Sequence, residues 1–317
     1  MKRETQRNTN PFPFSDTNKR YHTFDYYLRS MFGAKTAKIS LDAGFTCPNI
    51  DGTVGCGGCI YCSGGSSGAA AEGSLRLQYE KGKEIMERKW GCKNFIPYLQ
   101  AHTNTYAPIE TLERVYRECV YFEGAVMLAI ATRADCLDDE VISLLKRINC
   151  DIPVMVELGL QSIHDETAVR IGRGHSFAQF RDGYKRLRDA DSGIKIGVHL
   201  INGLPLETKA EMLESAAAVG EMKPDIIKFH LLHVLKNTRL ASLFESGEYV
   251  PMELEDYVET VCDQLESIPP EIAVGRVTGD GKAAELLAPL WSIKKTIVAN
   301  EIDKELFARN SWQGKKM

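Results

Sequence analysis

Six short, apolar, β-rich runs alternate with five amphipathic stretches in this chain, and this alternation constrains the fold more than any other feature. Within most of the runs apolar residues follow one another without strict alternation, which is typical of strands buried on both faces. Parallel strands need crossover connections, and crossovers within one sheet are right-handed. The sequence therefore predicts an α/β fold, a partial parallel (β/α)6 barrel whose active edge is formed by the C-terminal ends of the strands. The runs lie at residues 37–42, 94–100, 125–131, 152–158, 194–201 and 225–232, and the helical stretches at about 77–90, 109–122, 138–148, 177–190 and 208–221.

The alternation stops after the sixth run, and this divides the chain into three predicted parts. Residues 1–20 are polar, contain Pro11 and Pro13, and are expected to form a flexible arm. Residues 21–233 form the core domain, and residues 234–317 form an α-rich C-terminal extension packed on the core. Within this extension, MELEDYVETVCDQLESI and KAAELLAPLW are predicted helices, and IAVGRVTGDG is a predicted strand and turn.

Charge and hydropathy argue against several classes of protein. The 317-residue chain is 44% hydrophobic and has a net charge of −4, so any nucleic-acid contact is expected from local basic patches. It contains no stretch of about 18 uncharged apolar residues, which argues against a membrane span. The N-terminal segment lacks an apolar signal region, and a cytoplasmic location is expected. In that reducing compartment the nine cysteines are not expected to form a disulfide framework.

Four of these cysteines lie directly after the first run, with the spacing C-x8-C-x2-C-x2-C. A structural zinc site uses four thiolates but commonly pairs two separated C-x2-C knuckles, and a ferredoxin-type cluster has a further Cys and Pro downstream. Neither pattern is complete here. A group of reduced thiols that bind no metal is the third possibility. A [4Fe–4S] cluster held by three thiolates, with one iron open to another ligand, is the fourth possibility. Spacing alone nominates Cys56, Cys59 and Cys62 as readily as Cys47, Cys59 and Cys62.

The loop ends in CIYC, and this ending resembles the cluster motif of the radical S-adenosylmethionine (SAM) superfamily, in which the last two of three cysteines form C-x-aromatic-C. The segments LDAGFTCPNIDGTVGCGGCIYC, VELGLQSIHDETAVRIGRGHS and VHLINGLPLET are similar to the YtqA/YhcC-like group of that superfamily and, more distantly, to the radical SAM subunit of Elongator. The resemblance implies a [4Fe–4S] cluster on Cys47, Cys59 and Cys62, with Cys56 as an extra thiol and SAM on the open iron. It also implies the reaction: an electron from the cluster cleaves SAM, and the resulting 5′-deoxyadenosyl radical abstracts a hydrogen atom from the substrate.

Polar residues at the expected C-terminal edge are candidates for binding SAM. The loop QAHTNTYAP stands where the superfamily often has a Gly-Gly-Glu-like stretch, although it can equally be a capped loop before a helix. Glu157 lies in an apolar strand and needs a buried partner, for which the SAM ribose or Arg173 is expected; a structural ion pair is the alternative. His199 and Asn202 flank the end of the fifth run, and NGLP, which begins at Asn202, resembles the superfamily stretch beside adenine; a hydrogen-bonded core histidine is the commoner case for His199. The predicted cofactor-binding residues are Tyr61, Gln100, Thr103, Asn104, Glu157, Gln161, Arg173, His199 and Asn202.

Lys228 and His230 lie on the sixth run and are the predicted catalytic pair. A lysine inside an apolar strand is expected to point into a polar cavity or to form an ion pair, and here both residues are expected to face the substrate. A substrate that bears a carboxylate would suit such a cationic site.

The resemblance also suggests a substrate. The YtqA-type group includes MnmL-type enzymes, which convert 5-carboxymethylaminomethyluridine at the tRNA wobble position to the aminomethyl form, and the Elongator relative modifies the same uridine. The expected partners are therefore tRNA, whose phosphates the basic chain ends could contact, and a reductant such as flavodoxin or ferredoxin. A radical SAM reaction on a small molecule or a protein is the enzymatic alternative, and an RNA-binding module with a cluster or zinc is the non-enzymatic one.

Overall fold

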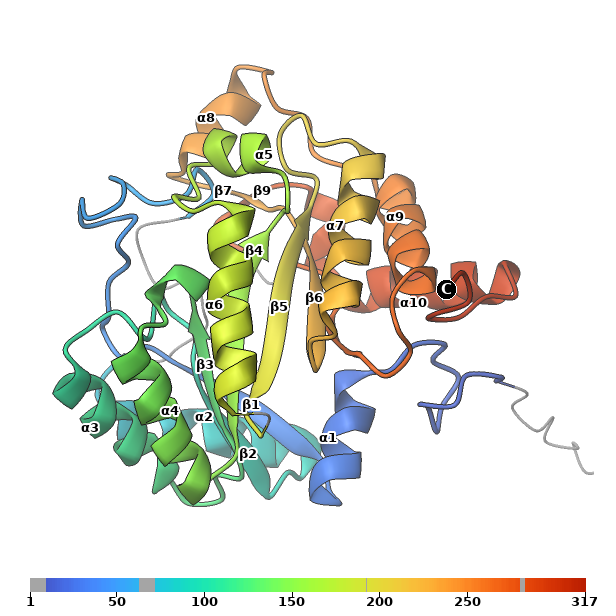
Figure 1. Ribbon diagram of the computed structural model, residues 1–317. Coiled ribbons are helices and arrows are strands. Elements are labelled where there is room, and N and C mark those ends of the chain that lie inside the picture. The colour runs from blue at the N-terminus through green and yellow to red at the C-terminus, as the bar shows by residue number, and fades with distance from the viewer. Residues whose placement is uncertain (1–9, 63–71, 192, 280–282) are drawn as a thin grey trace, which may run out of the picture.

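The computed structural model describes residues 10–62, 72–191, 193–279 and 283–317 (Figure 1). Its centre is a seven-stranded sheet in the order β1-β2-β3-β4-β5-β6-β8, with every neighbouring pair parallel. Each of the six apolar runs forms one strand, which confirms the predicted parallel α/β sheet. The strands are β1 (Thr36–Leu41), β2 (Asn94–Leu99), β3 (Leu128–Thr132), β4 (Val154–Gln161), β5 (Lys195–Asn202), β6 (Ile226–Leu231) and β8 (Ala273–Arg276).

The sheet is curled, as side-chain contacts across its concave face show. Lys38 on β1 and Lys228 on β6 both form ion pairs with Glu157 on β4. In a flat sheet β1 would stand about 14 Å from β4, which is beyond the reach of a lysine side chain. Helix α1 (Phe24–Phe32) contacts both edge strands, β1 and β8. The predicted partial barrel is therefore confirmed as an open half-barrel.

The crossover helices begin at caps that the sequence supplies. The Asp138 side chain accepts a hydrogen bond from the Val141 N–H at the start of α4, and Thr208 and Glu211 form a capping box at the start of α7. These caps fix where each strand-to-helix connection ends, and many residues of the candidate site lie in these connections. The crossover helices are α2 (Leu75–Trp90), α3 (Ile109–Val120), α4 (Asp139–Asp151), α6 (Phe177–Ala190) and α7 (Lys209–Met222), with a short α5 (Asp165–Arg170) before α6.

The strands form the centre of the hydrophobic core, because helices cover the convex face of the sheet (Figure 1). Leu41, Leu99, Ile130, Val156 and Val198 come from five consecutive strands, and each is 0% exposed. Burial of each such side chain contributes roughly 1.5–3 kcal/mol to stability. Among the described residues, no helix has the length and apolar character needed to cross a membrane.

The chain after β6 differs most from expectation. Strand β8 belongs to the predicted extension, yet it joins the main sheet beside β6. The predicted helix KAAELLAPLW is wrong, because its described part contains β9 (Leu286–Ala288), which pairs with β7 (Val234–Leu235). Pro289 has no N–H to donate and disfavours helical geometry in the residue before it. The other elements are α8 (Arg239–Glu245), α9 (Leu254–Glu266), which was predicted, the 3-10 turn η2 (Leu290–Ile293) and α10 (Lys295–Ala308).

Residues 10–20, the described part of the predicted arm, pack against the folded chain. Phe12 is 2% exposed, and Lys19 forms a 2.5 Å ion pair with Asp303 of α10. This segment is therefore anchored through both apolar and charged contacts. Residues 1–9 of the predicted arm lie outside the described residues.

Candidate active site

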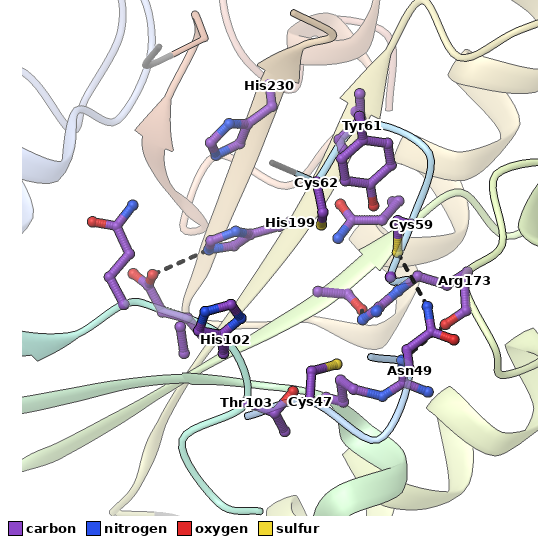
Figure 2. Close-up of a pocket in the computed structure, with 18 of the residues that line it drawn as sticks. Cys47, Asn49, Cys59, Tyr61, Cys62, His102, Thr103, Arg173, His199 and His230 are labelled. Atoms are coloured by element: carbon purple, nitrogen blue, oxygen red, sulfur yellow. Dashed lines mark hydrogen bonds and ion pairs between the residues drawn. The ribbon is translucent and has the colours of Figure 1, made fainter. Parts of the chain in front are cut away.

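A cavity of about 310 Å³ opens where the half-barrel strands end (Figure 2). It lies at the C-terminal ends of the strands, where the sequence predicts the chemistry of this fold. Most of the predicted site residues meet there, although they come from separate connections along the chain. Those that line the cavity are Cys47, Cys59, Tyr61, Cys62, Gln100, Thr103, Glu157, Gln161, Arg173, His199, Lys228 and His230.

The loop that carries the cysteines turns tightly after β1. The Ile50 N–H donates to the Cys47 carbonyl, and the Gly58 N–H donates to the Asn49 carbonyl, both at 2.8 Å. Gly57 and Gly58 have φ values of 77° and 73°, a left-handed conformation that glycine adopts without strain. These glycines therefore allow the tight turn that their position between the cysteines predicts.

Two other segments hold this loop from outside. The Ile60 N–H donates to the Ile171 carbonyl at 3.0 Å, and the Ile60 carbonyl accepts from the Leu240 N–H at 2.9 Å. Arg239, the neighbour of Leu240 on α8, donates to the Gly58 carbonyl. The C-terminal part of the chain thus helps to position the cysteine loop.

Three of the four loop cysteines share the cavity. The cavity is lined by Cys47, Cys59 and Cys62. Cys56 is exposed and lies outside the lining, and its backbone forms an isolated antiparallel β-bridge with Asp51. Within the described residues, no three His, Cys, Asp or Glu side chains are grouped to hold a metal ion. Three thiols at one cavity match the pattern of a [4Fe–4S] cluster with one open iron, whereas a structural zinc site takes four ligands. The donor set therefore fits a three-thiolate cluster, and its assignment to these cysteines stays a prediction.

The surroundings of Cys59 favour its thiolate. A hydrogen bond with Cys62 lowers the pKa of Cys59 well below its usual value, against the opposing effect of burial. The positive charges of Arg173 and Arg133 lower this pKa further, and the hydroxyl of Tyr61 points toward the same thiol (Figure 2). Because the thiolate is the form that ligates metals, these groups favour the metal-binding form of Cys59, while the same hydrogen bond raises the pKa of Cys62.

Glu157 forms the floor of the cavity with three partners. Its Oε2 accepts from Lys228 Nζ at 2.5 Å and lies 3.1 Å from His199 Nε2, while Oε1 accepts from Lys38. Burial opposes the charge of Glu157, but Lys228 and Lys38 hold its pKa well below the usual range. Burial in turn lowers the pKa of Lys228 to about 7, although Glu157 opposes this shift. Two lysines thus surround one carboxylate at the floor.

Arg173 is not the partner that the sequence suggested for Glu157. Its Nη2 donates to the Gly159 carbonyl at 2.5 Å, beyond the middle of β4, and Glu157 is instead paired with lysines that reach it across the concave face. Arg133 Nη1 donates to the Arg173 carbonyl at 2.8 Å, and Asp135 pairs with Arg133 at 2.7 Å. Arg133 therefore fixes the loop on which Arg173 lies.

His199 and His230 stack inside the cavity, with 5.3 Å between their ring centroids. Burial lowers the pKa of His199 to about 4 and that of His230 well below its usual value, so both rings are neutral at pH 7. His230 Nε2 and Arg173 Nε are buried and have no partner among the described residues. Buried polar atoms are rarely left without a hydrogen bond, so this lining suits a polar ligand.

Gln100 and Gln161 line the cavity, the first oriented by a side-chain hydrogen bond and the second by an unusual backbone conformation. The Ser40 hydroxyl donates to Gln100 Oε1 at 2.8 Å, which orients that amide. Gln161 has a φ of 78° and lies where the register between β4 and β5 shifts. Positive φ is uncommon outside glycine and costs energy, and such strain often accompanies functional positions.

Asn104 and Asn202, two further predicted SAM-binding residues, lie outside the cavity lining. Asn104 Nδ2 donates to backbone carbonyls at 2.9–3.1 Å and fastens its own loop. Asn202 exchanges hydrogen bonds of 2.8 and 2.9 Å with Gln264 of α9. Successive strand residues point to opposite faces, so Asn202 faces away from the cavity that His199 and Ile201 line.

Several site residues were missed from the sequence. Lys38 and Arg276 lie within β-rich runs, and a cation in such a run is the signal that identified Lys228. Asn49 and Arg133 lie in connections where no periodic pattern marks a functional residue.

Two known protein families match consecutive parts of this chain. The chain matches the Radical SAM superfamily over residues 51–219, which includes Cys59 and Cys62 but starts after Cys47, and the Radical SAM C-terminal domain over residues 224–308. The uncharacterized protein YtqA of Bacillus subtilis is 46% identical over 309 residues, or 96% of this chain and 95% of YtqA.

Two further comparisons are more distant. The tRNA uridine(34) acetyltransferase of Methanocaldococcus infernus is 26% identical over 274 residues, or 71% of this chain and 49% of that protein. The solved structure of archaeal Methanocaldococcus infernus Elp3 with an N-terminal deletion matches with a TM-score of 0.68 at 20% identity, and covers 88% of this chain and 64% of that chain. This structural likeness confirms the predicted radical SAM fold.

The two family matches cover strands β2 to β6, Cys59 and Cys62, and the C-terminal elements from α8 to α10. The similarity to YtqA extends over almost the whole of both chains, which confirms the predicted YtqA/YhcC-like relationship. Family members bind a [4Fe–4S] cluster and SAM, so the predicted cofactors are confirmed at the level of the family. With its half-barrel, its thiol-lined cavity and these matches, the chain belongs to the radical SAM superfamily.

Proposed function

We propose that this protein is an enzyme that converts 5-carboxymethylaminomethyluridine at the wobble position of tRNA to 5-aminomethyluridine. The observation that carries the proposal is the cavity floor, where Lys38 and Lys228 surround the single carboxylate of Glu157. Two amines face one carboxylate here, and a substrate that brings its own carboxylate would supply the second negative charge and stabilise their protonated forms. The similarity to a tRNA uridine(34) acetyltransferase supports a tRNA uridine as the nucleoside.

The lining residues have separate roles in this proposal. When bound, the cluster and SAM supply a 5′-deoxyadenosyl radical, and the protein positions the reactants and shields them from water. In its protonated form Lys228 Nζ has three N–H donors and gives one to Glu157, so it can also hold the substrate carboxylate, together with His230. The residues proposed to line the SAM site are Tyr61, Gln100, Thr103, Gln161, Arg173 and His199, around a cluster on Cys47, Cys59 and Cys62.

The described basic chain ends give little support to phosphate binding. Lys19 pairs with Asp303, and Lys316 pairs with Asp263 and Glu266. Because these lysines already have carboxylate partners, few of them remain to replace counterions on tRNA. We therefore expect the salt dependence of tRNA affinity to come mainly from basic residues outside the chain ends, since the slope follows the number of phosphates neutralised.

Nucleoside analysis of a deletion strain tests the proposal. Loss of the gene is expected to remove 5-aminomethyluridine and its derivatives and to accumulate the carboxymethylaminomethyl form, as measured by mass spectrometry of digested tRNA. The wild-type gene should restore the normal pattern, and a Cys59→Ala variant should not. We also propose a cytoplasmic location, where tRNA is found, and a reductant such as flavodoxin or ferredoxin.

Two outcomes would replace the proposal. Unchanged wobble nucleosides, together with formation of 5′-deoxyadenosine from SAM and dithionite, would indicate a radical SAM reaction on a small molecule or a protein. Unchanged nucleosides without SAM cleavage by the reconstituted protein would favour an RNA-binding module.

A further inference from the structure

Asn49 lies beside Cys59 and donates to it from within the same loop. Its side chain is 4% exposed, and Nδ2 lies 3.7 Å from the Cys59 sulfur and 2.6 Å from the Gly172 carbonyl oxygen. Figure 2 shows the contact with Cys59 as a dashed line. One amide nitrogen thus connects a predicted cluster ligand to the loop that carries Arg173.

The orientation of this carboxamide is fixed by its surroundings. Nδ2 faces two acceptors, and a flipped amide would place its oxygen against the Gly172 carbonyl and the Cys59 sulfur. A Cβ atom at Gly55 would lie 2.4 Å from Asn49 Oδ1, and a Cβ atom at Gly174 would lie 2.7 Å from it. Side chains at these two positions would displace the amide oxygen, so the glycines leave the space that Asn49 occupies.

We propose that Asn49 is a positioning residue that tunes the cluster through an N–H···S hydrogen bond to the Cys59 thiolate. Hydrogen bonds to cluster sulfurs stabilise the more negative, reduced state and raise the reduction potential. The hydrogen bond to Gly172 holds the amide in place for this contact. The proposal rests on Cys59 as a cluster ligand and is independent of the identity of the substrate.

Redox titration of the full-length, anaerobically reconstituted protein tests this role. Asn49→Leu keeps the branched shape of the side chain without either N–H donor and without a new charge, and Asn49→Ala removes the side chain. We expect both variants to disfavour the reduced cluster about tenfold, a shift of about 59 mV to lower potential for a one-electron couple. The midpoint potential is read from the electron paramagnetic resonance signal of the reduced cluster, with iron and sulfide measured in each sample.

Asn202→Ala is the matched control. Asn202 is also a buried asparagine, 1% exposed, but its hydrogen bonds go to Gln264. We expect this variant to lose stability without a change of potential. If the Asn49 variants carry a full cluster at the wild-type potential, or if Asn202→Ala shifts the potential equally, the proposed tuning role is wrong.

A second measurement covers the case in which the Asn49 variants fail to hold a cluster. Wild-type protein labelled with 15N only in asparagine is expected to show a weak nitrogen coupling to the reduced cluster in pulsed electron paramagnetic resonance. A purely structural asparagine outside hydrogen-bond contact with the cluster ligands would give no such coupling, and its absence would overturn the proposal.

Discussion

Glu157 and Lys228 form an ion pair inside the half-barrel, with 2.5 Å between Oε2 and Nζ. Their side chains are 0% and 7% exposed, and Lys38 reaches the same carboxylate from the opposite edge of the curled sheet. An interior ion pair is costly to desolvate, and close, well-oriented partners must offset that cost. With His199 as its third partner, this carboxylate on β4 therefore connects to β1, β5 and β6 and also sets the charge of the cavity floor.

Removal of this carboxylate is expected to destabilise the fold. Glu157→Gln leaves two lysines largely buried without their counter-charge, and the loss of one partner from such a pair costs about 3–5 kcal/mol. Urea denaturation of the apo-protein measures the change in the free energy of unfolding. Lys185→Gln, which breaks the exposed pair with Asp189, is the control and should have little effect. Equal effects for the two variants would contradict this interpretation of the floor.

Lys228 should make stability depend on pH. Burial lowers its pKa from 10.5 to about 7, so between these values the unfolded chain binds more protons at this lysine than the folded chain does. Its contribution to the free energy of unfolding therefore rises with pH across that window. Lys228→Met removes the contribution, and its stability should rise less steeply, or fall more steeply, than that of the wild type. Urea denaturation at several pH values checks this, and parallel profiles would argue against it.

The cysteine loop offers a matched pair of variants. Cys47 lines the cavity and Cys56 does not, although both lie in the same loop. Cys47→Ala is expected to lose the cluster and the formation of 5′-deoxyadenosine, whereas Cys56→Ala should retain both. Iron, sulfide and SAM cleavage are measured after anaerobic reconstitution. The reverse result would mean that Cys56 completes the ligand set, as the spacing alone allows.

The sequence predicted the features that depend on periodicity. Runs such as 125–131 and 152–158 are apolar on both faces because both faces are buried in the fold. This pattern can be recognised from the sequence without knowing which residues are in contact. The same argument placed the cysteine loop at the C-terminal edge, since it follows β1 directly. Position along a strand was therefore enough to gather most of the site.

The partners of each side chain depend on how far the sheet curls and on which face of a strand the residue lies. Neither could be predicted from the sequence. Lys38 and Glu157 are far apart in the chain and meet only because the sheet curls. Asn202 lies one residue after Ile201, and this single step turns it to the other face of β5. Pro289, in contrast, was a visible signal against the predicted helix over residues 282–291.

Lys228 and His230 should separate SAM cleavage from product formation. In the proposed reaction both hold the substrate carboxylate, while the thiols for the cluster lie on a different loop. Lys228→Met and His230→Gln are therefore expected to keep 5′-deoxyadenosine formation but to lower kcat/KM for tRNA about 10- to 100-fold, because a hydrogen bond to a charged group contributes about 1.5–3 kcal/mol. The ratio of 5′-deoxyadenosine to modified uridine, measured by mass spectrometry, reports this uncoupling. Loss of 5′-deoxyadenosine formation in an assay without tRNA would instead place these residues in SAM binding, because a group that contacts only the substrate has no effect on cleavage measured without it.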